Sequence, residues 1–557
     1  MKLISRSVFL RRAIASVAIS STFALQLFAQ AAAPARSAAS LAPAESELAE
    51  KITVASIKEM TGALSSPEME GRGTGQPGGD KAANWIAEKF KALGLKPLGD
   101  KGSYLQKVDF RETVMTEASF QIGETSLEHG TEFGFAPMGS SSKDVSGEIV
   151  FVSYGLQLKT NNVDMLAGQN LQGKVVVVTQ GPAPGITKKQ WDDAKVWSMI
   201  RRNILDQGAA ALVVIGNGSN EDQPDEAVTY FSRRQITMPN EEGAPAGYPP
   251  LIYVTAKGAE KIFAAAGKTL KETLEQGNNP QFKATNLKVK AKLTAKYKNA
   301  KVSASNVVGY LEGSDPSLKA EAVLFSAHYD AYGSENGKVY LGAADNALGT
   351  AEMLSVAEGF SKLEKKPRRS MVFLAVTGEE YGLYGSKYWA KDPTWDVKKV
   401  AANLNLDGIG SEVYGPVKTM VGYGAEHSSL GTILENVAKS YEINVIPDPM
   451  PDEKVFYRSD HYSFVERGIP SLMLLGAPAG DKEVWMKRIK DWEKVDYHQP
   501  GDSIQPGWAW EGAESVAEVM AIMGWRISET DAMPNWIPSS RFGKLERGNT
   551  KDLPEEK

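Results

Sequence analysis

The sequence predicts an α/β fold in which a mostly parallel mixed sheet lies between helices and carries an inserted α/β domain. Two observations predict the main sheet. Four apolar runs have the length of strands that are buried on both faces, at 322–327, 371–376, 401–406 and 471–475. Helical patterns at 348–363 and 428–441 separate these runs, and such alternation is typical of parallel sheets covered by helices.

The inserted domain is predicted from a change of sequence style between the first helices and these strands. Apolar residues recur at helical spacing from 82 to 93. Residues 111–301 then contain β-rich runs at 148–153, 174–179 and 209–215, with a helical pattern at 191–207. In Gly173-Lys-Val-Val-Val-Val-Thr-Gln-Gly and Gln207-Gly-Ala-Ala-Ala-Leu-Val-Val-Ile this succession resembles the protease-associated domain. We find no catalytic group of residues inside it.

The two ends of the chain are predicted to lie outside the folded domains. Basic residues precede the uncharged stretch 13–28, and Ala29-Gln30-Ala31 then offers small residues for cleavage. We interpret 1–31 as a signal peptide for export to the periplasm or the medium, 32–45 as a linker, and 531–557 as an extended tail. The main domain is predicted to be formed by 46–110 and 302–530.

Composition excludes several classes of function. A formal net charge of -5 supplies no broad positive field, so we expect no nucleic-acid partner and no stable membrane anchor once the signal peptide is removed. The chain has no cysteine, which excludes thiolate catalysis and cysteine-rich zinc sites. Any metal must therefore be bound by histidine, carboxylate and water. The oligomeric state is left open.

Acidic residues and a histidine follow the predicted strands directly. His328 and Asp330 follow the first strand, Glu379 and Glu380 the second, and Asp407 the third. Because ligands gather beyond the carboxyl ends of strands in such sheets, these side chains are expected at one rim. Carboxylates so close together would repel one another unless a cation neutralised them.

The residue types indicate two divalent metal ions, with zinc as the expected element. Imidazole and carboxylate without thiolate suit zinc or a related ion. Two ions ~3.5–4 Å apart need one shared carboxylate, and a hydrolytic site of this kind polarises a carbonyl while it activates a bridging water. Asp345, in Gly342-Ala-Ala-Asp-Asn-Ala-Leu-Gly, is the natural bridge.

Six ordered motifs resemble the dizinc exopeptidases of the bacterial leucyl aminopeptidase type (metallopeptidase family twenty-eight), whose wider relatives include glutamate carboxypeptidase II and transferrin receptor. The resemblance covers about 46–528 and implies the zinc exopeptidase fold. The motifs are Ala327-His-Tyr-Asp330, Gly342-Ala-Ala-Asp-Asn346, Gly378-Glu-Glu-Tyr-Gly-Leu-Tyr-Gly-Ser386, Asn405-Leu-Asp-Gly408, Ser459-Asp-His461 and Tyr497-His498.

The resemblance also implies the role of each residue. His328 and Asp407 would bind one metal, Glu380 and His498 the other, and Asp345 both. Glu379 would be the general base, and Tyr497 would help to hold the developing oxyanion. The supporting residues would be Asp330, which orients His328, Asp502, which orients His498, and the nearby Asp460 and His461. The Asp345–Asn346 peptide bond would be cis, as in relatives.

Three functions remain open from the sequence. The first is hydrolysis of N-terminal residues from peptide substrates by a dinuclear zinc aminopeptidase. The second is another reaction on the same scaffold, either release of a C-terminal acidic residue as in glutamate carboxypeptidase, or glutaminyl cyclisation. The third is a non-catalytic, receptor-like binding protein, against which the presence of every expected ligand and of the base argues.

Overall fold

The computed structural model describes residues 41–136, 142–158, 162–187, 191, 195–217, 225–239, 249–408, 411–478, 480–549 and 553. The predicted signal peptide and most of the predicted linker lie outside these residues. Helix α1 (Pro43–Lys51) begins inside the predicted linker, so that boundary was placed too late. No helix among the described residues is long and apolar enough to cross a membrane.

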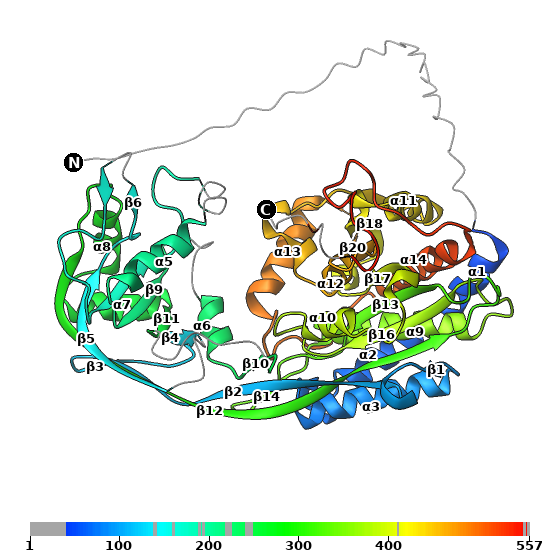
Figure 1. The fold of residues 1–557 in the computed structure, drawn as a ribbon, viewed down its shortest axis with the longest axis horizontal. Coiled ribbons are helices and arrows are strands. Elements are labelled where there is room, and N and C mark those ends of the chain that lie inside the picture. Colours follow the sequence, from blue (N-terminus) through cyan, green and yellow to red (C-terminus); the bar gives the residue numbers. More distant parts are fainter. Residues whose placement is uncertain are drawn as a thin grey trace, which may run out of the picture. The chain divides into compact units, whose positions relative to one another are not determined.

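The part of the chain that carries the predicted site residues is built on seven neighbouring strands of one large sheet (Figure 1). Their order across the sheet is β19 (Asn444–Ile446), β18 (Val417–Tyr423), β20 (Ser471–Pro478), β17 (Val400–Asn405), β13 (Ala322–His328), β16 (Ser370–Val376) and β12 (Thr285–Leu311). The pairs β13–β16, β13–β17, β17–β20 and β18–β19 are parallel, whereas β18–β20 and β12–β16 are antiparallel.

Alternate residues of each strand point to opposite faces of this sheet, and both faces are covered. In β13, Val323 and Phe325 belong to one buried cluster, and Ala322 and Leu324 to another. The first cluster includes residues of α2 (Val54–Leu64), α3 (Pro77–Ala92), α9 (Gly349–Ser361), α11 (Leu430–Ser440) and α14 (Trp510–Glu529). The second includes residues of α10 (Tyr384–Lys391) and α12 (His461–Val465).

The predicted strands are confirmed within two or three residues at their ends as β13, β16, β17 and β20, and the predicted helices as α9, α11 and α3. The fold class is therefore confirmed as a mixed α/β sheet flanked by helices. The edge strands β18 and β19 were not predicted. Antiparallel pairing of β18 with β20 makes the sheet mixed at this edge.

The inserted segment, residues 111–301, has hydrophobic clusters of its own. The long strands β2 (Leu105–Ile122) and β12 pair antiparallel and lead into it. Its sheet continues through β5 (Lys143–Phe151), β8 (Val175–Thr179), β9 (Ala211–Ile215), β11 (Leu251–Val254) and β4 (Phe133–Ala136), with β3 (Thr125–Leu127) and β10 (Gln235–Thr237) pairing with β2. Its helices are α5 (Val196–Asp206), α6 (Asp225–Phe231), α7 (Ala256–Ala265) and α8 (Leu270–Gly277).

The C-terminal residues are not the extended tail that was predicted. Trp536, Phe542 and Leu545 are buried in one cluster with Phe456. The guanidinium of Arg547 donates to the carbonyl oxygens of residues 400 and 401 at the start of β17. This stretch is rich in Pro, Arg and Glu, but its apolar side chains attach it to the part of the chain that carries the predicted site residues.

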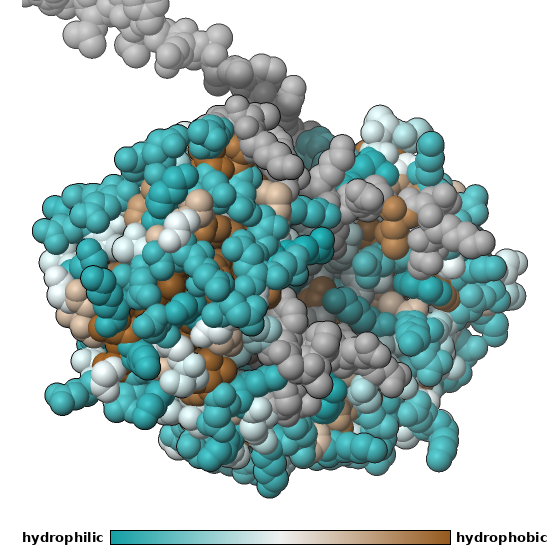
Figure 2. Space-filling view, turned by 60° about the vertical axis from the view of Figure 1, so that its left-hand side comes forward, coloured by the Kyte–Doolittle hydropathy of each residue, from teal (hydrophilic) through white to brown (hydrophobic). Residues whose placement is uncertain are grey.

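On the face drawn in Figure 2, hydrophilic residues predominate and apolar residues are interspersed among them. The remaining elements are short or peripheral. They are β1 (Lys96–Pro97), β6 (Gln157–Leu158), β7 (Val163–Asp164), β14 (Gly333–Glu335), β15 (Lys338–Tyr340) and α13 (Lys482–Val495).

Candidate metal centre

The carboxyl ends of three adjacent parallel strands form the rim on which the site is built. His328 is the last residue of β13, Asp407 follows β17 by two residues, and Glu379 follows β16 by three. Parallel pairing of β13 with both β16 and β17 brings these ends together. The rim is thus where a sheet of this kind gathers its ligands.

Five side chains meet at this rim in two groups that share Asp345. In the first, His328 Nε2 lies 3.1 Å from Asp345 Oδ1 and 3.2 Å from Asp407 Oδ1. In the second, His498 Nε2 lies 3.3 Å from Asp345 Oδ2 and 3.1 Å from Glu380 Oε2. Within each group the candidate ligand atoms lie within 4.8 Å of one another. Asp345 therefore directs one carboxylate oxygen to each group.

The donor set fits two divalent cations. Each group offers one imidazole nitrogen and two carboxylate oxygens, the ligand types that zinc accepts in the absence of thiolate. Among the described residues, Glu380 Oε2 is buried and receives no hydrogen bond. A buried carboxylate oxygen without a donor costs free energy, and a bound cation would remove that cost.

The turn that carries Asp345 is fixed by hydrogen bonds to its backbone. The Asp345–Asn346 peptide bond is cis, as predicted. The carboxylate of Asp502 accepts hydrogen bonds from the N–H groups of Ala344 at 2.8 Å and Asp345 at 3.0 Å. Asp502 was predicted to orient His498, but its carboxylate instead holds the backbone of the shared ligand.

His328 is oriented mainly by a backbone oxygen. Its Nδ1 lies 3.2 Å from the carbonyl oxygen of Asp330 and 3.8 Å from the nearer carboxylate oxygen of that residue. The Asp330 carboxylate accepts hydrogen bonds from the Thr74 hydroxyl at 2.9 Å and the Glu379 N–H at 3.3 Å. Asp330 therefore joins the ends of β13 and β16 in addition to contacting His328.

Two tyrosines contact His498, which has a left-handed φ of 57°. Tyr332 Oη lies 3.3 Å from His498 Nδ1, so this hydroxyl is the polar partner of the ring. Tyr497 stacks on the imidazole, with ring centroids 3.6 Å apart. Tyr332 was not predicted, because it is 166 residues away in sequence.

Glu379 lies beside the first group without making its shortest contacts. Its Oε2 is 4.0 Å from His328 Nε2. Burial raises the pKa of Glu379 well above its usual range, and the charges of Asp407 and Asp460 raise it further against the opposing charge of His328. Divalent cations at this rim would relieve that repulsion and favour the carboxylate form.

Asp460 and His461 are fully buried behind the rim. Burial, with the charges of Asp407 and Asp330, raises the pKa of Asp460 to about 7. His461 packs edge-on against Phe456 with ring centroids 5.2 Å apart, so it supports the site by packing. The neighbouring Ser459, which was not predicted, donates a short hydrogen bond to Asp407 Oδ2.

The glycine-rich loop 73–78 is part of the site, although no predicted strand or motif includes it. Thr74 Oγ1 accepts a hydrogen bond from the N–H of Gly378 at 3.1 Å, in addition to its contact with Asp330. The preceding Arg72 is fully buried and donates to the carbonyl oxygens of Tyr329, Leu64, Leu341 and Gly342. This arginine holds the turn before Asp345.

A small cavity of about 90 Å³ opens beside His328, Asp345 and Asp407, with Glu379 also on its wall. Its wall combines the rim residues with apolar groups and two charged side chains. The non-rim lining residues are Tyr423, Met450, Val455, Arg458, Ser459, Met473, Leu475, Glu493 and Tyr497. The cavity therefore has a polar floor at the rim and a largely apolar side.

A sequence model described as peptidase family M28 matches residues 306–523, which contain all five side chains. The similarity to peptidase family M28 thus covers the part of the chain that carries the candidate ligands. The family assignment agrees with the resemblance noted from the sequence motifs.

Solved structures with this fold include two aminopeptidases. The chain is similar to the aminopeptidase from Aneurinibacillus sp. strain AM-1 over 88% of its own length and 97% of that chain, at 20% identity and a TM-score of 0.58. It is similar to BSAP, a zinc aminopeptidase from Bacillus subtilis, over 90% and 99%, at 16% identity and a TM-score of 0.55. At these identities the similarity is one of fold.

Curated relatives match a smaller part of the chain than these solved structures do. A vacuolar membrane protease of Candida dubliniensis is 36% identical over 118 residues, which are 20% of this chain and 12% of the relative. A probable glutamate carboxypeptidase of Arthroderma benhamiae is 25% identical over 251 residues, 41% and 31% of the two lengths. The chain thus spans between 12% and 31% of the length of these two relatives.

The predicted location in the periplasm or the medium is corrected by this comparison. The yeast relatives that match this chain are described as vacuolar membrane proteases, not as exported enzymes. The prediction rested on residues 1–31 alone, which lie outside the described part of the chain.

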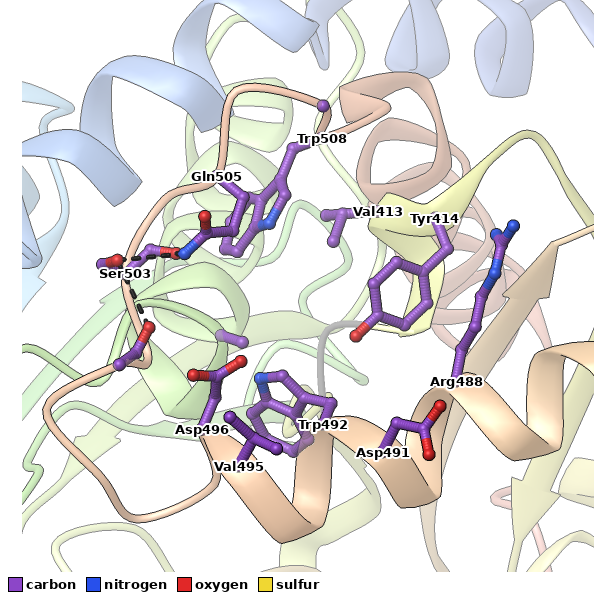
Figure 3. Close-up of a pocket in the computed structure, with 13 residues that line it drawn as sticks. Val413, Tyr414, Arg488, Asp491, Trp492, Val495, Asp496, Ser503, Gln505 and Trp508 are labelled. Atoms are coloured by element: carbon purple, nitrogen blue, oxygen red, sulfur yellow. Dashed lines mark hydrogen bonds between the residues drawn. The ribbon is translucent and has the colours of Figure 1, made fainter.

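A second, larger cavity of about 460 Å³ is lined by residues of α13 and of the stretch 501–508 (Figure 3). Trp492, Trp508 and Tyr414 line it, with Asp491 and Arg488 on the wall formed by α13. It contains none of the five candidate ligands, although Ala344 lies at its edge. The size of a cavity alone therefore does not identify the candidate metal centre.

Proposed function

We propose that the chain is a metal-dependent exopeptidase that hydrolyses N-terminal residues from peptides. One observation carries the proposal. The two carboxylate oxygens of Asp345 point to two separate groups of ligand atoms, each completed by a histidine and a second acid. Such a shared carboxylate is the feature that two adjacent cations need.

Two divalent ions bound here would act as Lewis acids on the scissile carbonyl and lower the pKa of an attacking water. His328, Asp345 and Asp407 would hold one ion, and Asp345, Glu380 and His498 the other. These five side chains are the proposed ligands because their imidazole and carboxylate atoms lie within 4.8 Å of one another in each group.

Glu379 is the proposed general base. Its carboxylate lies at the rim but outside the two ligand groups, so it is available to accept a proton. It takes the proton of water as the water oxygen bonds to the carbonyl carbon, and then delivers that proton to the amine nitrogen as the C–N bond breaks. Tyr497, which lines the cavity, is proposed to donate to the oxyanion that forms meanwhile.

The small cavity supports removal of one terminal residue rather than cleavage inside a long chain. A volume of about 90 Å³ accommodates a single side chain. The acidic groups Glu379 and Glu493 on its wall suit a free α-amine, and Met473 and Leu475 suit an apolar side chain. The similar solved structures are described as aminopeptidases, one of them a zinc enzyme.

A carboxypeptidase is the second candidate, and Arg458 is the observation that favours it. This arginine lines the cavity, where its guanidinium would bind a substrate carboxylate. One curated relative is described as a probable glutamate carboxypeptidase. For the inserted segment, its α/β order supports the further proposal that it is a protease-associated domain.

The test combines metal analysis with two substrates. Purified protein supplied with zinc is assayed on leucine anilide, which has a free N-terminus, and on an acyl-glutamate, which has a free C-terminus. Turnover of the anilide alone supports the aminopeptidase, and turnover of the acyl-glutamate alone defeats it in favour of the carboxypeptidase. Protein that retains no metal and is inactive after zinc addition would instead be a binding protein.

A further inference from the structure

A short stretch of the inserted segment, residues 230–237, contacts the candidate metal centre. Strand β10 in this stretch pairs antiparallel with β2, with Gln235 opposite Thr113 and Thr237 opposite Arg111. Ile236 is buried in the same apolar cluster as Tyr332 and Tyr340. Backbone pairing and apolar packing therefore fix the position of the two arginines that precede the strand.

Arg233 is directed at the backbone of His498. Its Nη2 donates a short hydrogen bond to the His498 carbonyl oxygen, across 265 residues of sequence. The guanidinium carbon lies 4.2 Å from the ring centroid of Tyr332 and 4.5 Å from that of Tyr340. The residue is only 6% exposed, so these contacts are made largely out of water, where cation–π attraction and charge-assisted hydrogen bonds are stronger.

The same tyrosine contacts both Arg233 and His498. Tyr332 Oη lies 3.3 Å from His498 Nδ1, and the two rings pack edge-on with centroids 4.9 Å apart. Arg233 thus restrains the carbonyl of His498 directly and its imidazole through Tyr332. His498 follows the end of α13 and has a left-handed φ, so helical hydrogen bonds do not hold it.

The next residue, Arg234, anchors the stretch through three further hydrogen bonds. Its Nη2 donates to the carbonyl oxygen of Thr74 at 2.7 Å, and its Nε donates to Glu112 Oε1 at 2.8 Å. Its backbone N–H donates to Glu335 Oε1 at 2.6 Å. Movement of Arg233 away from His498 would therefore require several further contacts to break.

We propose that Arg233 is a positioning residue through which the inserted segment sets the affinity of the second cation group, Asp345, Glu380 and His498. This inference rests on the proposed dinuclear function. Groups that orient a metal-bound histidine typically change metal affinity by about 10–100-fold when removed. His328 and Asp407, which complete the first group, have no contact of this kind with Arg233. The effect is therefore selective for one of the two ions.

Stepwise titration of metal-free protein with Co²⁺, followed by visible absorption and by bound metal per chain, tests this. In Arg233→Ala one of two binding steps should weaken at least about tenfold while the other is unchanged. Arg233→Lys, which keeps the charge and a donor, should recover part of the loss. The matched control is Arg202→Ala, which removes an exposed arginine of α5 and should leave both steps as in the parent protein.

The outcomes separate the inference from the function on which it rests. If the parent protein takes up fewer than two ions, the proposed dinuclear function fails. If it takes up two and both steps stay within about twofold in Arg233→Ala, the function stands and the positioning role of Arg233 is overturned. Tyr332→Phe gives a second measurement when the alanine variant does not fold, and unchanged binding there overturns the role equally.

Discussion

The carboxylate of Asp502 accepts a hydrogen bond from the backbone N–H of Asp345 at 3.0 Å, and so holds the residue shared by the two ligand groups. Because the adjacent N–H of Ala344 is also bound, at 2.8 Å, both oxygens of Asp502 are used. The position of Asp345 therefore depends on Asp502, which itself belongs to neither ligand group.

We therefore expect Asp502→Ala to weaken binding of both ions by about 10–100-fold, since Asp345 belongs to both groups. Asp502→Asn, which keeps one acceptor oxygen, should lose less. Competition with a chelator measures this for each variant. A loss confined to one ion would show that Asp502 acts on His498, as the sequence had predicted, and not on the shared turn.

Glu379→Gln should separate base catalysis from metal binding. The substitution removes the proton acceptor but leaves the five candidate ligands intact, so we expect kcat to fall by about 10²–10⁴-fold with unchanged metal content. Measurement of kcat and bound zinc on the same sample checks both halves. Loss of zinc in proportion to activity would mean that Glu379 is a ligand.

Much of the site could be predicted because its residues follow strands whose apolar runs are evident in the sequence. His328 and Asp407 come directly after such runs, and the rule that parallel strands gather ligands at one rim brought them together. The prediction of the main sheet succeeded for the same reason. The edge strand β18 has a mixed burial pattern with exposed Lys418, which weakens the signal.

The supporting residues could not be predicted, because their contacts join distant parts of the chain. Arg72 meets Tyr329 across 257 residues, and Arg233 meets His498 across 265. Thr74 lies in none of the predicted strands and in none of the six motifs. Asp502 was assigned to His498 from the family resemblance, whereas its carboxylate binds the backbone of Asp345.

Arg72→Met should destabilise the fold rather than alter catalysis selectively. The buried guanidinium donates to four backbone carbonyl oxygens, and its loss leaves these acceptors without their donor. We expect the free energy of unfolding of metal-free protein to fall by at least about 3 kcal/mol in urea titrations. The control Lys81→Met, which removes an exposed ion pair with Glu70, should change it by less than about 1 kcal/mol.

Two buried carboxyl groups of the core should make stability fall at alkaline pH. Burial and the charge of Glu412 raise the pKa of Glu352 well above its usual range, and burial raises the pKa of Glu412 to about 7. Raised values in the folded state mean that their contribution is full below the unfolded pKa, about 4.3, and is lost as pH rises through the folded values.

Glu352→Gln, which keeps a neutral side chain of similar shape, should therefore reduce the fall in unfolding free energy between about pH 6 and about pH 9. Urea titrations of metal-free protein at the two pH values measure this, with exposed Glu260→Gln as the control. Equal falls in the parent protein and Glu352→Gln would refute the role of this pair.

The most direct measurement is anomalous X-ray diffraction at the zinc absorption edge from crystals grown with zinc. We predict two peaks about 3.5–4 Å apart, on either side of the Asp345 carboxylate, one beside His328 and one beside His498. A single peak, or zinc bound only away from Asp345, would contradict the account of a shared dinuclear centre.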